Sequence, residues 1–409
     1  MRSDASRAVE LELREQAPRV LAALVRRHGN FDRCEDAVQE ALVEAHLAWR
    51  DVPERPFGWL LTVAERRFVD SVRSDSARTR REERLAALAP PPYAIRDDGC
   101  DDTLDLLLLC CHPSLPVASQ VALALRAVAG FTTAEIARAL LTSESALAQR
   151  IVRAKARLRG VPFGDPPALE RGPRVAAVLH VLYLIFTESH VASGGTDLVR
   201  DDLAAEALRL IRRLHTALRD DGEVQSLLAL MLLTIARRKS RLTADGALVP
   251  LPEQDRTQWD AAAIGEGTAL VEDALAKGPV GPYGLQAAIA ALHAEAPDGD
   301  STDWPQILAL YDLLAGLDSN PVVALNRAVA LGEVEGPQAG LAVLTALDRR
   351  LRHGDRHRVH AVRGYLLARA GDAYAAALAY ERAAREATIP AEHRHLAARA
   401  AEQYAVAQR

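Results

Sequence analysis

The chain has 409 residues, of which 49% are hydrophobic, 26% are charged and only 4% are aromatic, and its formal net charge is −5. This composition is typical of a soluble globular protein with two or three domains, and abundant Ala and Leu with few aromatic residues favour packed helices over β architecture. We therefore expect an all-α fold. Four cysteines are too few for a disulfide framework in a chain of this size, so apolar cores must stabilise this fold.

The first predicted region covers about residues 5–74 and is helical. Residues 1–14 are charged throughout, which argues against a secretory signal peptide. A helix over about residues 34–50 would turn inward an apolar face formed by Val38, Leu42, Ala45 and Trp49. Its opposite face is mostly acidic and carries Asp36, Gln39, Glu40 and Glu44. Such a face is usually only solvated, and because its sign is wrong for DNA, a functional role would require a basic protein partner.

A second helix of this region is expected over about residues 56–73. Its buried stripe would consist of Phe57, Leu61, Ala64, Phe68 and Val72. Trp59 lies on the opposite face, in line with Arg66 and Arg73. An exposed tryptophan can stack on an unpaired base while arginines hold phosphate groups. The alternative is that a neighbouring helix or the following segment covers this tryptophan.

Two segments rich in helix breakers divide the rest of the chain. Residues 75–102 pass from an Arg-rich start through three prolines to an acidic cluster, and we predict a flexible linker there. Residues 160–167 hold two glycines and three prolines and separate a second region, 103–160, from a third, 172–409. The first 160 residues are almost balanced in charge, so nucleic-acid binding by this part would depend on local basic patches.

The second region is predicted to contain a helix-turn-helix. Thr132 and Glu135 have the spacing of a capping box, and the helix that begins there would point Ile136 and Leu140 inward. Thr142 or Ser143 can cap a second helix that reaches to about residue 159.

The two faces of that second helix differ in character. Leu147, Ile151, Ala154 and Leu158 form an apolar stripe, whereas Ser145, Gln149 and Arg153 point the other way, flanked by Arg150 and Arg157. Short polar side chains near a helix start can reach base edges, and arginines further along can neutralise phosphates. The alternative is an ordinary helical hairpin with a solvated basic face.

The third region is predicted to be a long helical array. Its longest apolar run, residues 175–186, is interrupted by His180 and is too short to span a bilayer, so we expect a cytoplasmic protein. From about residue 303 the sequence favours helix-pair repeats, with a pattern of small and large residues over 361–383 and a weaker copy over 322–344. Such repeats form a concave surface suited to a peptide or protein partner, or they only stabilise the fold.

Other chemistry is not supported by the sequence. Cys100, Cys110, Cys111 and His112 match no usual zinc spacing, and the cysteine pair continues an apolar run. No phosphate-binding glycine loop and no nucleophile elbow is present. We therefore expect no metal, no cofactor and no enzymatic activity.

The order of these motifs resembles that of the bacterial extracytoplasmic-function sigma factors. Residues 36–41 resemble region 2.2 of that family, residues 55–64 and 66–70 resemble regions 2.3 and 2.4, and residues 130–137 with 150–159 resemble region 4.2. Residues 174–179, 183–186, 227–233 and 285–296 resemble a subgroup with a fused C-terminal extension that ends in tetratricopeptide-like repeats. This chain departs from the family at Leu141, where many members have glycine, and over residues 145–150 of the recognition helix, which leaves its DNA sequence preference open.

The resemblance implies a sigma factor that binds core RNA polymerase, through the β′ clamp helices and the β flap, and promoter DNA. It assigns region 2 to residues 5–74, region 4 to 103–160 and a regulatory extension to 172–409. Its implied polymerase-binding residues are Asp36, Gln39, Glu40 and Glu44, and those for the −10 element are Trp59, Arg66, Arg67 and Arg73. Those implied for the −35 element are Thr133, Ser143, Ser145, Gln149, Arg150, Arg153 and Arg157.

Two other functions remain open from the residues alone. A helix-turn-helix regulator with a ligand-sensing helical domain would bind duplex DNA without polymerase, but it leaves the acidic helix and Trp59 unexplained. A helical-repeat scaffold that only recruits proteins would leave the basic helix unexplained.

Overall fold

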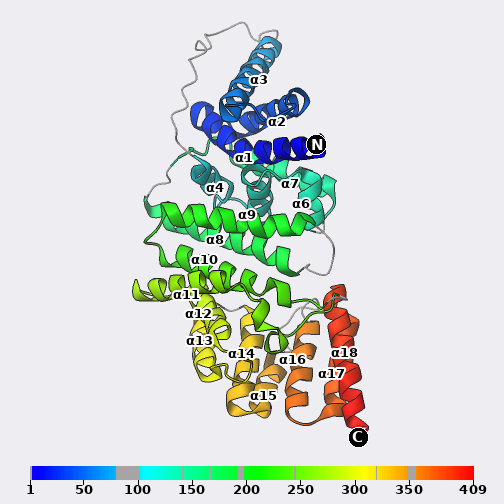
Figure 1. Ribbon diagram of the computed structural model, residues 1–409. Helices are drawn as coiled ribbons and strands as arrows, with labels where there is room; N and C mark the ends of the chain where they lie inside the picture. Colours follow the sequence, from blue (N-terminus) through cyan, green and yellow to red (C-terminus); the bar gives the residue numbers. More distant parts are fainter. Residues whose placement is uncertain are drawn as a thin grey trace. The chain divides into compact units, whose positions relative to one another are not determined.

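The computed structural model describes residues 2–79, 102–140, 142–164, 168–191, 198–243, 246–318, 320–347 and 356–409. All regular segments in these residues are helical, apart from one isolated bridge between Leu242 and Leu248 (Figure 1), which confirms the predicted all-α fold. The chain forms two compact units, Met1–Glu188 and Ser189–Arg409. The predicted linker lies mostly outside the described residues.

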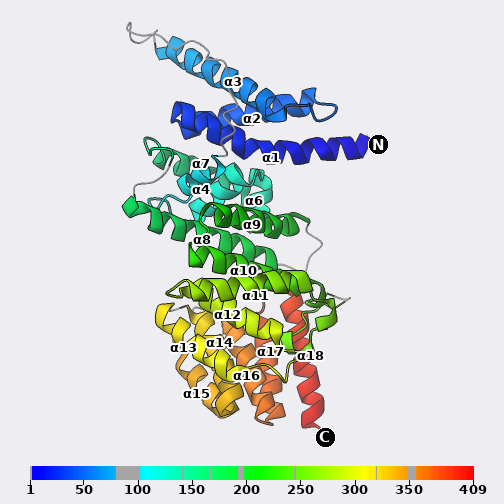
Figure 2. The ribbon, with the colours of Figure 1, turned by 60° about the vertical axis from the view of Figure 1, so that its left-hand side comes forward.

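The helices of the first unit fall into two groups. The first group is α1 (Arg2–His28), α2 (Phe31–Ala48) and α3 (Pro56–Thr79), which pack on one another in layers (Figure 2). The second group is α4 (Thr103–Cys110), α5 (Val117–Leu123) with its π-helical continuation η1 (Ala124–Val128), α6 (Thr133–Ala139) and α7 (Glu144–Arg157). The long helix α8 (Ala168–Val191) follows and runs across the boundary between the two units.

Helix α2 begins three residues earlier than the sequence analysis expected. The side chain of Asn30 accepts a hydrogen bond from the backbone N–H of Arg33 (3.2 Å) and caps the helix. Gly29 has φ +67°, a conformation that allows the sharp turn from α1 and that glycine adopts without strain. On the predicted inner face Val38 and Ala45 are buried, whereas Leu42 and Trp49 are only half-buried.

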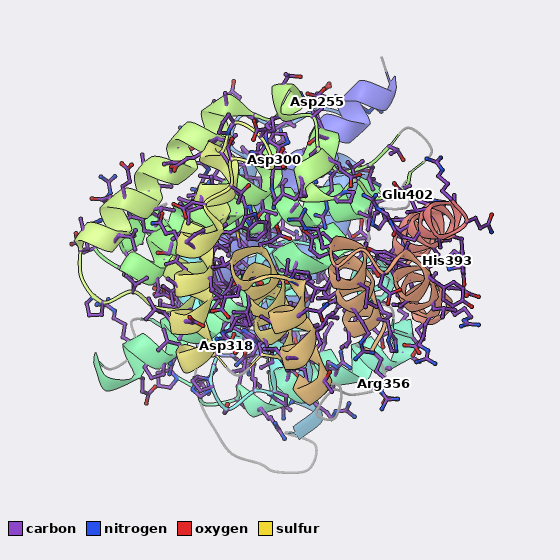
Figure 3. All side chains as sticks on the ribbon, turned by 90° about the horizontal axis from the view of Figure 1, so that it is seen from below. Asp255, Asp300, Asp318, Arg356, His393 and Glu402 are labelled. Atoms are coloured by element: carbon purple, nitrogen blue, oxygen red, sulfur yellow. The ribbon has the colours of Figure 1, made fainter. Side chains whose placement is uncertain are left out.

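The second unit is an array of helices joined by short connections, interrupted by one irregular segment. It contains α9 (Leu198–Ala217), α10 (Gly222–Ala236), the short 3₁₀ helices η2 (Arg238–Ser240), η3 (Leu251–Glu253) and η4 (Arg256–Gln258), α11 (Ala261–Ala276), α12 (Pro282–Glu295), α13 (Trp304–Leu317), α14 (Pro321–Glu335), α15 (Pro337–Leu347), α16 (Arg356–Arg369), α17 (Ala373–Glu386) and α18 (Pro390–Ala407). From α10 onward each α-helix packs against the next. Figure 3 shows the last helices nearly end on, with His393 and Glu402 on α18.

Helix pairs follow one another over the part of the extension where repeats are predicted, from about residue 303. Helix α13 begins at Trp304 behind an Asp303 cap, and α16 begins 35 residues after α14 (Arg356 against Pro321). In the last repeat the side chain of Asp372 caps α17 by accepting a hydrogen bond from the backbone N–H of Ala375 (3.0 Å). The starts of α13 and α17 are thus marked by capping residues that are visible in the sequence.

In the described part of the chain, no helix combines the length and the apolar character needed to cross a bilayer.

Candidate nucleic-acid interface

The helix-turn-helix is present and is capped as the sequence predicts. The side chain of Thr132 accepts a hydrogen bond from the backbone N–H of Glu135 (3.2 Å), and the Glu135 carboxylate accepts one from the backbone N–H of Thr132 (2.7 Å). Ser143, one of the two predicted capping residues, caps α7: its Oγ accepts a hydrogen bond from the backbone N–H of Ala146 (3.3 Å). Two satisfied helix starts fix the angle at which α7 leaves the turn.

Helix α7 has one buried and one solvent-facing side. Its predicted apolar stripe is confirmed, because Leu147, Ile151, Ala154 and Leu158 are all buried. The candidate DNA-contacting side chains lie as follows: Ser143, Ser145, Gln149, Arg153 and Arg157 are exposed, and Arg150 and Thr133 are half-buried. Within the described residues, the guanidinium groups of Arg150, Arg153 and Arg157 make no ion pair. The outer face of α7 therefore presents unneutralised positive charge.

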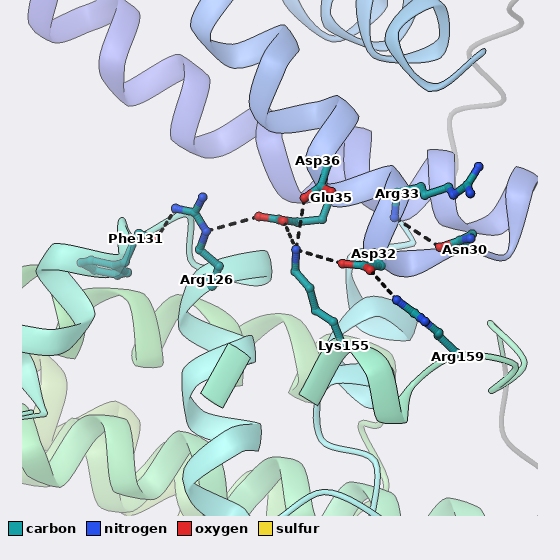
Figure 4. Close-up of polar contacts among 9 residues, drawn as sticks. All are labelled: Asn30, Asp32, Arg33, Glu35, Asp36, Arg126, Phe131, Lys155 and Arg159. Carbon is teal, nitrogen blue, oxygen red and sulfur yellow. Dashed lines mark hydrogen bonds and ion pairs between the residues drawn. The ribbon is translucent and has the colours of Figure 1, made fainter. Parts of the chain in front are cut away.

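Lys155, from the same basic run, points to the opposite side and is buried. Its ammonium nitrogen lies 2.5 Å from Glu35 Oε2, 3.3 Å from Asp36 Oδ1 and 3.4 Å from Asp32 Oδ1, all on α2 (Figure 4). Burial by itself would lower the pKa of Lys155, but the three carboxylates outweigh it and raise that pKa. Lys155 is therefore unavailable to DNA in this arrangement.

Further ion pairs join the three-helix group to the helix-turn-helix. Arg126 of η1 lies 3.3 Å from Glu35, and Arg159 lies 3.3 Å from Asp32 (Figure 4). Arg14 of α1 lies 2.8 Å from Glu135, the same carboxylate that completes the capping box. This interface could not be predicted from the sequence, because each pair joins residues that are far apart in the chain and no local pattern signals them.

The predicted polymerase-binding face of α2 is partly occupied within the chain. Asp36 and Glu40 are exposed, whereas Gln39 and Glu44 are half-buried. The Glu44 carboxylate accepts hydrogen bonds from Arg67 (2.6 Å) and Arg66 (2.9 Å) of α3, and these bonds lower the pKa of Glu44. Arg66 and Arg67, which are predicted to contact the −10 element, thus bind Glu44, which is predicted to contact polymerase. These pairs are largely solvated, so each contributes little to stability.

Two apolar side chains on α2 were not singled out from the sequence. Val43 and Leu47 retain 62% and 81% of their accessible surface, one turn apart and close in the helix to Glu40 and Glu44. Large apolar side chains exposed beside acidic ones are typical of a protein-docking surface. Their i, i+4 spacing is the signal that could have identified them.

Trp59 is less accessible than the sequence analysis supposed. It is half-buried, and its ring lies edge-on to that of Trp49 with centroids 5.3 Å apart. The cover therefore comes from the residue that ends α2, in line with the alternative in which a neighbouring helix covers Trp59. Arg66 and Arg73 remain exposed and Arg67 is half-buried.

The cysteine pair at the end of α4 belongs to the core. Cys110 and Cys111 are both fully buried, and burial raises the pKa of each thiol. Cys100 lies outside the described residues. Among the described residues, no cluster of three or more His, Cys, Asp or Glu side chains has a geometry that could hold a metal ion.

Comparison with known families places the candidate residues in two matched segments. Residues 13–78 match the family described as Sigma-70 region 2, and residues 105–158 match Sigma-70, region 4. These segments contain all the candidate residues of α2, α3, α6 and α7. Residues 174–275 match a family of unknown function, DUF6596.

One relative matches the chain over nearly its whole length. An uncharacterized protein of Rhizobium meliloti (strain 1021) is 42% identical over 395 residues, which is 94% of this chain and 93% of that protein. Among solved structures, the crystal structure of the yeast Tom70 matches 99% of this chain and 86% of its own, with 13% identity and a TM-score of 0.33.

Proposed function

Because the chain belongs to the extracytoplasmic-function type of RNA polymerase sigma factor that carries a C-terminal extension, we infer that its role is in transcription initiation. From that premise we propose that it directs core polymerase to specific promoters, helps to open the −10 element and is regulated by its fused helical extension. It acts by binding, without catalysis of its own.

The observation that carries this proposal is the outer face of α7. Ser145 and Gln149 stand near the start of the helix, and Arg150, Arg153 and Arg157 follow without internal neutralisation by described residues. A helix of this kind in the major groove contacts base edges with its first turns and phosphates with its later arginines. We assign this face to the −35 element.

The −10 element is assigned to α3. Arg66 and Arg73 are exposed on the side that carries Trp59, so a separated DNA strand can lie along them with its phosphates neutralised. Because Trp59 is half-buried and its ring packs against that of Trp49, only part of the Trp59 ring is available to stack on a base. Glu44 must release Arg66 and Arg67 before both can hold phosphate.

Core polymerase is assigned to the exposed side of α2, on the β′ clamp helices, with the β flap contacting the helix-turn-helix region. Asp36 and Glu40 supply charge for a basic partner, and Val43 and Leu47 supply apolar area. Asp36 is the residue that Lys155 also contacts, at 3.3 Å. Polymerase binding and the α2–α7 contact therefore compete for the same carboxylate.

Substitution Leu47→Ser tests the polymerase assignment. Because the Leu47 side chain is exposed in the free protein, its removal leaves the fold intact. Burying a leucine at an interface contributes about 1.5–3 kcal/mol, so we expect core polymerase to bind about 10–100-fold more weakly. Leu317→Ser is the matched control, since Leu317 is 58% exposed on α13 of the extension. Titration of labelled protein with core polymerase measures both, and equal affinities for the two variants would contradict the assignment.

The regulatory assignment to the extension is tested by truncation after residue 191, at the end of α8. Coupling between sites in regulated proteins is on the order of 1–3 kcal/mol, so promoter-dependent transcription should change about 5-fold or more relative to the full chain. Equal activity of the two proteins at equal occupancy of polymerase would show that the extension is passive.

The function as a whole is tested by reconstituted transcription. Purified chain and core polymerase are combined with fragments of the source genome, and the start sites are mapped. Discrete starts that share −35 and −10 elements are expected. Binding of duplex DNA without core polymerase, together with no dependence of transcription on the chain, would favour the helix-turn-helix regulator instead.

A further inference from the structure

The irregular segment between α10 and α11 contacts the last helix of the extension. Residues 246–253, which we call the strap, lie beside α18 (Figure 1). The guanidinium of Arg394 on α18 donates a hydrogen bond to the backbone carbonyl of Gly246 (2.8 Å), and that of Arg399 pairs with the carboxylate of Glu253. These contacts join residues 148 and 146 positions apart, whereas the helices of the extension pack mainly on their neighbours in the chain. The strap therefore links an early part of the array to its end.

The strap has a defined conformation where it meets α18. Gly246 has φ +77°, and a Cβ atom at this position would lie 3.1 Å from a guanidinium nitrogen of Arg394. Glycine therefore allows both the left-handed turn and the close contact. Beyond the other end of the strap, the buried side chain of Gln254 donates to the backbone carbonyl of Val249 (3.0 Å). These bonds shape the strap independently of its contact with α18.

The contact between the strap and α18 is polar and accessible to water. No side chain of residues 246–253 is fully buried, and the Glu253 side chain retains 53% of its accessible surface. Ion pairs of this kind contribute little to stability because water and salt screen them. Helix α18 itself is held by an apolar cluster in which Leu396 and Ala400 pack against Tyr380 of α17. The strap can therefore leave α18 without unfolding the last repeat.

We propose that the strap closes the helical array by holding α18, and that its release is the conformational switch of the extension. A ligand or partner can regulate a domain only by shifting it between arrangements of similar free energy. Exposed polar contacts between distant parts of the array provide such a pair of arrangements, with the strap bound or released. The contact itself does not depend on the sigma-factor assignment, whereas its use in regulation rests on the proposed function.

Hydrogen–deuterium exchange of the strap amides in the full chain tests the contact. The double variant Arg394→Met/Arg399→Met removes both contacts, so we expect the strap to exchange about 2–10-fold faster than in the wild type. Raising NaCl from about 0.05 M to about 0.5 M should speed exchange in the wild type, and much less in the double variant, because salt screens the ion pair. Arg382→Met/Arg385→Met, which alters two exposed arginines of α17, is the matched control and should leave strap exchange unchanged.

A further variant tests the ion pair from the side of the strap. Glu253→Gln removes the charge of an exposed side chain, so the fold is retained. Combined with Arg399→Met, it should speed strap exchange no more than either substitution alone, because both remove the same contact. Equal strap exchange in the wild type and in the arginine double variant, or additive effects of Glu253→Gln and Arg399→Met, would overturn the proposal.

Reconstituted transcription separates the switch from the proposed function. The arginine double variant should change promoter-dependent transcription in the same direction as truncation after residue 191. If the truncation changes transcription but the double variant does not, although its strap is released, the switch is wrong and the proposed function stands. If neither changes transcription, regulation by the extension is wrong, and the exchange data alone decide whether the strap closes the array.

Discussion

Replacing both Arg150 and Arg153 by alanine is expected to abolish promoter-specific transcription while core polymerase binds as before. Both side chains lie on the outer face of α7 and have no ion pair with any described residue, so the fold is little affected. In a DNA complex each arginine contact is worth about 1–3 kcal/mol, so removing two should lower promoter occupancy by on the order of 10²-fold. Promoter-directed transcript yield from the reconstituted holoenzyme measures the effect.

Two comparisons make this result specific. Arg382→Ala removes an exposed arginine from α17 in the extension and should leave transcription unchanged. If the arginines neutralise phosphates, the double variant should also show a weaker dependence of promoter binding on salt concentration, by about one unit of slope for each phosphate that is no longer neutralised. Unchanged transcription by the double variant would exclude α7 as the −35 reader.

The helix-turn-helix could be predicted from the sequence because its signals are local. Thr132, Glu135 and Ser143 lie within one turn of the helix ends that they cap, and the stripe from Leu147 to Leu158 has the helical period. Several helices of the extension have equally local signals, since Asn320 and Asp372 cap the starts of α14 and α17 and Pro390 begins α18. Elements of this kind carry their own boundaries in the sequence.

What the sequence could not predict depends on contacts between distant segments. The basic run of α7 gives no sign that Lys155 alone points inward, because only the position of α2 makes that direction favourable. Trp59 has the spacing of an exposed residue on α3, yet it is half-buried and its ring packs against that of Trp49.

Lys155 occupies the centre of the interface between α2 and α7. Glu35 is 4% exposed, and its nearest cation is the Lys155 ammonium at 2.5 Å, while Arg126 lies at 3.3 Å. Removing one partner of a buried ion pair leaves the other without full compensation, which costs about 3–5 kcal/mol. The contact also holds α2, the proposed polymerase-binding helix, against α7, the proposed reader of the −35 element. On the assignments proposed above, α7 reads the −35 element and α3, which packs against α2, reads the −10 element; because the two elements are separate along the DNA, the contact between α2 and α7 must open for both to be bound.

Substitution Lys155→Met is therefore expected to lower the free energy of unfolding of the first unit by about 3 kcal/mol while strengthening the binding of core polymerase several-fold. Methionine keeps the length and the packing of the side chain but removes the charge. Urea unfolding and a polymerase titration measure the two effects. Arg159→Met is the matched control: Arg159 contacts Asp32 from the same end of α7, but its side chain is 70% exposed, so its removal should cost less than about 1 kcal/mol.

The dependence on pH follows from the raised pKa of Lys155. A cation whose folded pKa lies above its unfolded value, about 10.4 for lysine, contributes its full stabilisation below that value and loses it as the pH rises through the folded pKa. The stability difference between wild type and Lys155→Met should thus be constant from about pH 6 to pH 9 and shrink only at higher pH. If Lys155→Met lowers the affinity for core polymerase together with the free energy of unfolding, the contact between α2 and α7 supports polymerase binding and does not compete with it.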